Sequence, residues 1–397
     1  MRNPLSETIV NIKPSGIRKY FDLVAQMNDP EVISLGVGEP DFETPWHIRE
    51  EGIYSLEKGR TFYTSNSGLQ ALRDEISLQQ HKLNNVIYNP YKEIMITVGG
   101  SEAIDIALRA MLDPGDEVII PQPSYVSYEP CTVLAGGVPV IVEMKEKDQF
   151  KLTLEELEAA YTPKTKILIL PFPNNPTGSI MTREDLEPIA KFCVDHDLYV
   201  LSDEIYSALT YETKHFSIVS LPGMRDRTVL INGFSKAYAM TGWRLGYACA
   251  PQVILQQMLK IHQFAIMCAP TTSQYAAVEA LRNGDKDIEV MRESYNERRR
   301  YLMHEFRKMQ LDCFEPYGAF YVFPSIKSLQ MTSDEFAMEL LREEKVAVVP
   351  GTAFGACGEG YLRISYAYSL EELKTALRRV ERFVQNRRAR LKGEEIV

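Results

Sequence analysis

Short apolar runs rich in β-branched residues alternate along the chain with longer amphipathic segments. The clearest runs are Ile94–Val98, Lys166–Leu170, Leu198–Leu201 and Thr228–Ile231. Each is short and followed by turn-forming residues, which predicts a buried strand. Strands that alternate with helices are typical of a mostly parallel sheet covered on both faces. The pattern therefore predicts an α/β fold up to about residue 250.

Helix starts are marked by capping boxes, in which a Ser or Thr precedes an acidic residue by three positions. The pairs are Thr153 with Glu156, Thr182 with Asp185, Thr332 with Glu335, and Ser369 with Glu372. Another helix is expected to start within Ser15–Val24. A long charged helix, about Asp287–Gln310, follows the Asn283–Gly284 turn and leads away from the sheet.

Beyond that helix lie G-A-F-Y-V-F, V-A-V-V-P and Y-L-R-I-S-Y, which predict a second, smaller domain. The expected division is an N-terminal arm with part of the small domain at 1–48, a large domain at 49–286, and a small C-terminal domain at 287–397. A length of 397 residues suits two domains.

Composition excludes some classes of function. The net charge of −10 argues against a nucleic-acid backbone as partner. No apolar stretch reaches the length of a membrane span, and the N-terminus lacks a signal core. The six cysteines have neither disulfide-frame nor zinc spacing, so we expect free thiols and a cytoplasmic protein.

Candidate chemistry centres on Asn232–Gly246, N-G-F-S-K-A-Y-A-M-T-G-W-R-L-G. Lys236 follows the end of a predicted strand among small and aromatic residues, where lost hydration lowers an amine's pKa. Such an amine forms Schiff bases with a substrate or with the aldehyde of pyridoxal phosphate. Arg244 is a rigid fork suited to a phosphate. The alternative is a surface lysine with a salt-bridging arginine.

Two glycine-rich turns also follow predicted strands. Gly99-Gly100-Ser101-Glu102 opens a helix, where free N–H groups suit a phosphate, although such turns often only cap a helix. In Val32–Pro40, the residues Gly36, Gly38 and Pro40 imply a backbone that comes close to another group. Asp41 replaces the third glycine of a dinucleotide fingerprint, which excludes that motif.

The stretch S-K-A-Y-A-M-T-G-W-R-L-G-Y resembles the lysine signature of class I aminotransferases, a fold-type I family that uses pyridoxal 5'-phosphate. The resemblance runs from about Ser15 to about Phe383. It implies an α/β fold-type I transferase, with a mostly parallel seven-stranded-type sheet between helices in the large domain and a smaller α+β domain. It also implies a homodimer with shared active sites, in which an amino group moves by a ping-pong scheme from an L-amino acid to a 2-oxo acid such as 2-oxoglutarate.

The resemblance assigns roles to individual positions. Lys236 would hold the cofactor and act as general base, Asp203 would pair with the ring nitrogen, and Tyr206 would bond the 3'-oxygen. The other cofactor-binding positions are Gly100, Ser101, Glu102, Tyr125, Asn175, Ser235, Arg244 and Tyr63 of the neighbouring subunit. The substrate positions are Gly38, Asn175, Ile17 and Arg363, the last clamping the α-carboxylate. From the residues alone, Tyr63 and Arg363 also suit exposed positions and Tyr125 suits core packing.

One position departs from the family pattern. Many members have a serine three residues before the lysine, and this chain has Gly233. The phosphate site is then expected to depend on Gly100, Ser101, Ser235, Arg244 and the neighbour's Tyr63.

Substrate choice is the least specified property. Dicarboxylate-specific relatives need a second cation, whereas Ser15–Tyr20 and Gly36–Gly38 supply Ile17, Tyr20 and Val37, with the directions of Arg18 and Lys19 open. An apolar wall favours neutral or aromatic donors, because burying an unpaired carboxylate is unfavourable. The alternatives are an aspartate or acetyl-diaminopimelate aminotransferase, a pyridoxal-phosphate-dependent β-lyase or decarboxylase-like enzyme, and a non-catalytic amine-sensing regulator.

Overall fold

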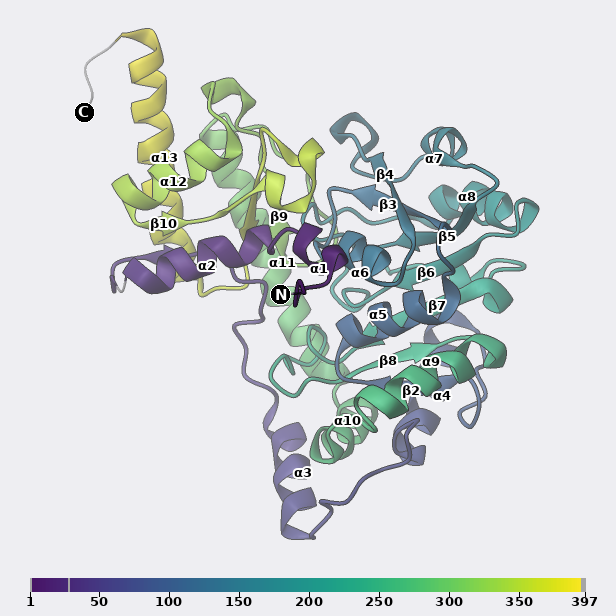
Figure 1. The fold of residues 1–397 in the computed structure, drawn as a ribbon. Coiled ribbons are helices and arrows are strands. Elements are labelled where there is room, and N and C mark those ends of the chain that lie inside the picture. Colours follow the sequence, from purple (N-terminus) through teal and green to yellow (C-terminus); the bar gives the residue numbers. More distant parts are fainter. Residues whose placement is uncertain (1, 28, 394–397) are drawn as a thin grey trace.

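A seven-stranded sheet forms the centre of the larger part of the molecule (Figure 1). The computed structural model describes residues 2–27 and 29–393. Across the sheet the strand order is β2-β8-β7-β6-β5-β3-β4. The strands are β2 (Ile94–Thr97), β3 (Glu117–Gln122), β4 (Val138–Glu143), β5 (Thr165–Leu170), β6 (Tyr199–Asp203), β7 (Thr228–Gly233) and β8 (Gly246–Cys249). Only β8 is antiparallel to its neighbours, so the predicted mostly parallel sheet is confirmed.

The four predicted apolar runs lie in β2, β5, β6 and β7, with ends shifted by one or two residues. Neither β4 nor β8 was among the predicted strands. The sequence of β8, Gly-Tyr-Ala-Cys, lacks β-branched residues and so gives no strand signal. Its glycine has a steric reason, because a Cβ on Gly246 would lie 2.6 Å from the carbonyl carbon of Gly99.

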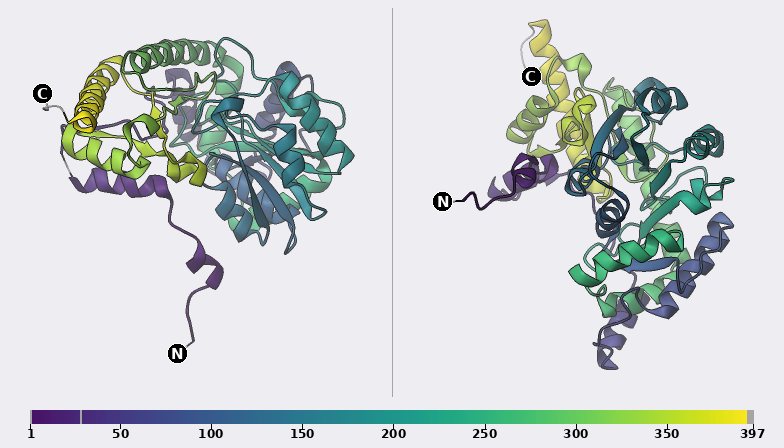
Figure 2. Two further views of the ribbon diagram at one scale, coloured as in Figure 1. Left: turned by 90° about the horizontal axis from the view of Figure 1, so that it is seen from above. Right: turned by 45° about the vertical axis from the view of Figure 1, so that its right-hand side comes forward.

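Helices cover both faces of the sheet (Figures 1 and 2). Successive residues of β7 point to opposite faces, so Val229 and Ile231 enter one apolar core and Leu230 another. The helices on the first face are α5 (Gly100–Met111), α6 (Tyr128–Leu134) and α9 (Gln252–Ala265). Those on the second are α4 (Gln70–Asn84), α7 (Leu154–Ala160), α8 (Arg183–Asp195) and α10 (Thr271–Asn283), with α3 (Trp46–Glu57) beside α10.

The long helix α11 (Asp285–Lys308) leads to a smaller group of elements and confirms the predicted charged helix, two residues earlier than expected. A three-stranded antiparallel sheet follows, in the order β11 (Val349–Pro350), β12 (Leu362–Ser365), β9 (Tyr321–Val322). Beside it, β1 (Ile33–Ser34) pairs in parallel with β10 (Val346–Ala347). The accompanying helices are α2 (Gly16–Met27), α12 (Ser333–Glu344) and α13 (Leu370–Lys392).

The predicted helix starts are present. The Thr182, Thr332 and Ser369 side chains each form a complete capping box. Thr153 accepts only the backbone N–H of Glu156. The helix expected within Ser15–Val24 is α2, and a short helix α1 (Glu7–Asn11) precedes it in the segment that projects from the body in Figure 2.

The boundaries at 48/49 and 286/287 remain predictions. The parallel pairing of β1 with β10 joins an N-terminal segment to the C-terminal elements, as an N-terminal contribution to the small domain requires. In the part of the chain that the structure describes, no helix is long and apolar enough to cross a membrane.

Candidate active site

A cavity of about 510 Å³ opens where β5, β6 and β7 end. Carboxyl ends of parallel strands are where α/β folds bind ligands. Most of the predicted site residues line this cavity. They are Ile17, Gly38, Gly100, Ser101, Tyr125, Asn175, Asp203, Tyr206, Ser235, Lys236, Arg244 and Arg363.

Lys236 lies in the turn after β7, and its side chain lines the cavity. Its Nζ donates a hydrogen bond to the carbonyl oxygen of Gly38 at 2.6 Å. The pKa of Lys236 is lowered to about 8, chiefly by burial; the charge of Glu39 opposes this shift, and the cations Arg363 and Arg244 add to it. A substantial fraction of the amine is therefore neutral near pH 8 and able to act as a nucleophile or a base.

Asp203 is the last residue of β6, and its carboxylate is buried at the cavity. Oδ2 accepts a hydrogen bond from the Tyr128 hydroxyl at 2.7 Å, and Oδ1 accepts the backbone N–H of Ile205 at 3.2 Å. Burial raises the pKa of Asp203 to about 6; the two hydrogen bonds oppose this, and the charge of Glu204 adds to it. A buried carboxylate without a protein cation is suited to a ligand N–H⁺.

A phosphate-sized cradle lies at the start of α5. Gly99 has φ of 79°, and a Cβ on it would lie 2.7 Å from Arg244 Nη2, so the guanidinium packs against bare backbone. The first-turn N–H groups of α5, which begins at Gly100, and the positive end of its dipole add to this cation. Ser101 and Ser235 also line this side of the cavity.

Gly233 has a steric explanation. A Cβ there would lie 3.0 Å from the Leu245 carbonyl oxygen and 3.0 Å from Ile205 Cδ1, which is tighter than ordinary van der Waals contact. A serine would require one of these neighbours to move.

Arg363 reaches the cavity from β12 and is 2% exposed. Its Nη1 donates to Asn175 Oδ1 at 3.1 Å and its Nη2 to the Gly36 carbonyl, while Nε has no partner. The guanidinium also lies over the Tyr321 ring, 4.6 Å from its centroid. Among the residues that the structure describes, no carboxylate pairs with this buried cation, so an anionic ligand would complete it.

Two predicted residues are not brought into the cavity. The Glu102 carboxylate accepts the Val98 N–H and lies 2.6 Å from His262 Nδ1, so this side chain faces α9. Only its backbone remains a candidate for anion binding. Tyr63 is 79% exposed and does not line the cavity of its own chain.

The two cations whose directions were open also lie elsewhere. The Arg18 side chain is 77% exposed and reaches Asp22 at 3.9 Å, and that of Lys19 is 71% exposed and reaches Asp334 at the same distance. Neither lines the cavity.

Several lining residues were missed from the sequence, and three of them have clear polar contacts. Tyr128 donates to Asp203, Tyr321 Oη lies 2.8 Å from Tyr206 Oη, and Glu39 accepts a hydrogen bond from Thr241. Tyr128 comes three residues after Tyr125 in P-S-Y-V-S-Y, but nothing in the sequence says which hydroxyl meets Asp203.

Comparison with known proteins gives the decisive observation. A sequence model described as "Aminotransferase class I and II" matches residues 30–380. The chain belongs to the class I and II aminotransferase family. This aminotransferase is 48% identical to an aspartate aminotransferase of Pyrococcus abyssi and 45% identical to aromatic-amino-acid aminotransferase 2 of Thermococcus litoralis, each over 97% of this chain and 99% of the relative.

The fold agrees with this assignment. The structure of aspartate aminotransferase from Thermus thermophilus with maleate superposes with a TM-score of 0.92 at 38% identity, covering 96% of this chain and 100% of that one. The predicted fold-type I architecture and amino-acid aminotransferase activity are therefore confirmed. Members of the family use pyridoxal phosphate and act on amino acids and 2-oxo acids.

Proposed function

We propose that this aminotransferase binds pyridoxal 5'-phosphate at the cavity around Lys236 and moves amino groups from neutral or aromatic L-amino acids to a 2-oxo acid such as 2-oxoglutarate. The observation that carries the proposal is the convergence of Lys236, Asp203 and Arg363 on one cavity. Asp203 and Arg363 are buried and Lys236 is partly buried. Each of the three suits a different part of the reaction.

The lining residues fit the cofactor. The Arg244 guanidinium, the α5 N-terminus at Gly100, and the Ser101 and Ser235 hydroxyls suit the phosphate. Asp203 has Tyr128 and Ile205 as hydrogen-bond donors and no cation beside it among the described residues, so it suits a protonated pyridine nitrogen. Asn175 and Tyr206 would bond the 3'-oxygen, and Tyr125 would cover the ring. When bound, the cofactor supplies an electron sink for the substrate Cα.

Lys236 would form the covalent link to the cofactor and would also transfer the proton of the substrate Cα. Its amine, with a pKa lowered to about 8, is free to take a proton from the substrate Cα and to return it elsewhere. The Gly38 carbonyl orients Nζ at the cavity wall. Arg363 would hold the substrate α-carboxylate, so that the bond to be broken has one orientation.

Substrate preference follows from the charges of the wall. Among the described lining residues, the cations are Lys236, Arg244 and Arg363, and each already has a role. Ile17, Val37 and Ile104 contribute apolar surface. A side-chain carboxylate would find no further cation among these described lining residues, and burying it unpaired is unfavourable by several kcal/mol.

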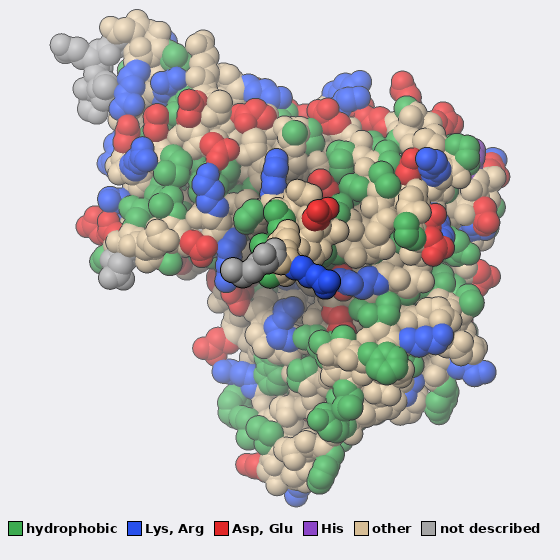
Figure 3. Space-filling view, viewed as in Figure 1, with side chains coloured by type: hydrophobic (Ala, Val, Ile, Leu, Met, Phe, Trp, Pro, Cys, Tyr) green, Lys and Arg blue, Asp and Glu red, His purple; other side chains and the backbone are tan. Residues whose placement is uncertain are grey.

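The proposed enzyme is a homodimer whose two active sites each include a residue of the partner subunit. Several large apolar side chains in the segment from Trp46 to Tyr63 are exposed, including Trp46 at 59% and Phe62 at 81%. Figure 3 shows hydrophobic side chains over the lower part of the molecule, where α3 lies. Exposed apolar surface of this kind is typical of a subunit interface, and it would let Tyr63 of the partner subunit complete the phosphate site.

The experiment is a visible spectrum followed by a substrate panel. The purified protein should absorb visible light, and borohydride should remove the band and fix the cofactor mass to Lys236. With 2-oxoglutarate as acceptor, kcat/KM for phenylalanine, tyrosine, methionine or alanine should exceed that for aspartate. A Lys236→Ala protein with wild-type turnover would falsify the mechanism. Aspartate ahead of every neutral donor would instead favour the aspartate aminotransferase alternative, with a cation supplied by the partner subunit.

A further inference from the structure

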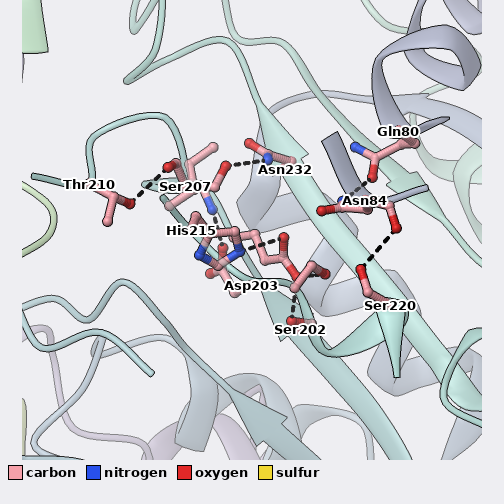
Figure 4. A network of polar contacts seen from close by, with 12 residues as sticks. Gln80, Asn84, Ser202, Asp203, Ser207, Thr210, His215, Ser220 and Asn232 are labelled. Carbon is pink, nitrogen blue, oxygen red and sulfur yellow. Dashed lines mark hydrogen bonds and ion pairs between the residues drawn. The ribbon is translucent and has the colours of Figure 1, made fainter. Parts of the chain in front are cut away.

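A buried polar network lies directly behind the strand end that carries Asp203 (Figure 4). Its hub is Glu204, which is 2% exposed. The Glu204 carboxylate accepts hydrogen bonds from the hydroxyls of Ser202, at 2.9 Å, and Ser217. His215 Nε2 lies 2.9 Å from Oε2 and is the donor there, because a carboxylate only accepts.

Both backbone polar groups of Glu204 are also hydrogen-bonded. Its N–H donates to the Ile231 carbonyl of β7 at 2.8 Å, and its carbonyl accepts the Ser207 N–H at 2.9 Å. The Ser207 hydroxyl in turn accepts from Asn232 Nδ2 at 3.0 Å. The network therefore joins the end of β6 to the end of β7, just before the turn that holds Lys236.

Residues of the network and residues of the cavity are interspersed along the segment 202–207. Asp203, Ile205 and Tyr206 line the cavity, whereas Glu204 and His215 do not. Stability alone explains such a hub poorly, because well-packed apolar residues of similar volume often stabilise a core as well or better. A fully satisfied network instead fixes one geometry.

We propose that Glu204 and His215 form a positioning pair that aims Asp203 and Tyr206 at the pyridoxal phosphate ring. The inference rests on the proposed function. Glu204 stands between Asp203 and Tyr206 in the chain, and its bond to His215 limits the rotation of the backbone at the end of β6. This keeps the Asp203 carboxylate in contact with Tyr128 and the Tyr206 hydroxyl in contact with Tyr321. His215, 14% exposed at its side chain, closes the network toward solvent.

The sharpest test is a matched pair of serines. Ser217 immediately precedes the short turn Ile218–Ser220 and Ser220 is its last residue, but the Ser220 hydroxyl donates to the Asn84 carbonyl and not to Glu204. Ser217→Ala should raise the pyridoxal phosphate dissociation constant about threefold to tenfold and lower kcat, with KM for the amino donor unchanged, because one hydrogen bond to the buried carboxylate is lost. Ser220→Ala should alter none of these quantities.

Conservative and disruptive variants of the pair extend the test. His215→Gln keeps an N–H donor for Glu204 and should retain most of the cofactor affinity that His215→Leu loses. Glu204→Gln should weaken cofactor binding more than Ser217→Ala does. All measurements are made well below each variant's melting temperature, because a purely structural role would lower that temperature and leave the dissociation constant of the folded protein unchanged.

The outcomes separate this inference from the proposed function. A wild-type protein that binds no pyridoxal phosphate would overturn both. A wild-type protein that binds it, with Ser217→Ala folded and unaltered in affinity and kcat, would overturn the positioning role alone. If Glu204→Gln fails to fold, the comparison of Ser217→Ala with Ser220→Ala still decides whether the network has a positioning role.

Discussion

Removing the Tyr128 hydroxyl should change the acid behaviour of the cofactor site. In Tyr128→Phe, the buried Asp203 carboxylate loses a 2.7 Å hydrogen bond and keeps its burial. A hydrogen bond to a charged group contributes about 1.5–3 kcal/mol. Since one pKa unit corresponds to about 1.4 kcal/mol, the pKa of Asp203 in the cofactor-free protein should rise by about one to two. From about 6, this lowers the ionised fraction at neutral pH from about nine-tenths to about half or less.

The assay is the association constant of pyridoxal phosphate with cofactor-free protein, measured across pH. Binding should weaken as pH falls through the pKa of Asp203, and this acid limb should move upward by about one to two pH units in Tyr128→Phe. Tyr125→Phe is the matched control, because the Tyr125 hydroxyl lies 3.4 Å from Ser101 Oγ, whereas Asp203 accepts its hydrogen bonds from Tyr128 and Ile205. An acid limb at the same pH in wild type and Tyr128→Phe would refute the reasoning.

Three further predictions concern Lys236, Arg363 and Tyr63. Replacing Lys236 by Met in the cofactor-free protein should raise the free energy of unfolding by about 3 kcal/mol below pH 8, measured with urea, because a buried ammonium is removed. The gain should shrink as pH rises from about 8 toward 10.5, and a gain that is constant with pH would contradict this origin. Arg363→Gln should raise KM for the amino donor about a hundredfold, with cofactor affinity retained; an unchanged KM would remove its carboxylate role. Mixing Lys236→Ala with Tyr63→Phe chains should restore activity in hybrid dimers, and no gain on mixing would mean that Tyr63 does not act across the interface.

The sequence predicted the elements and the strand-end positions better than the directions of side chains. Asp203 and Lys236 could be placed at the cavity because both follow apolar runs whose carboxyl ends meet at one edge of a parallel sheet. Glu102 was assigned to the cofactor by the resemblance, yet its carboxylate turns back to the Val98 N–H and His262. A carboxylate in the first turn of a helix can cap the backbone or face a ligand, and sequence alone does not distinguish these.

Long-range partners were the other limit. Glu204 stands beside Asp203 in the sequence, but its partner His215 comes from a loop eleven residues later, and the pairing depends on the path of that loop. β8 was not predicted because it begins with Gly246, which is required by the close approach of the Gly99 backbone. That contact joins segments far apart in the chain, so it could not be inferred from the local sequence. The homodimer and the role of Tyr63 depend on a second subunit and remain predictions.

The pairing of β1 with β10 has a consequence for how the protein is made. Leu35 donates its N–H to the Ala347 carbonyl, and its own carbonyl accepts from Ser365. The wall at Gly36–Gly38, which holds Lys236 and Arg363, is thus fastened by residues near the other end of the chain. On a ribosome that adds about 5–20 residues per second, the early segment cannot complete these contacts until Ser365 has been added. Closure of the pocket therefore comes well after the synthesis of Lys236, and nascent chains that stop before Ser365 carry this lysine without a completed pocket to shield it.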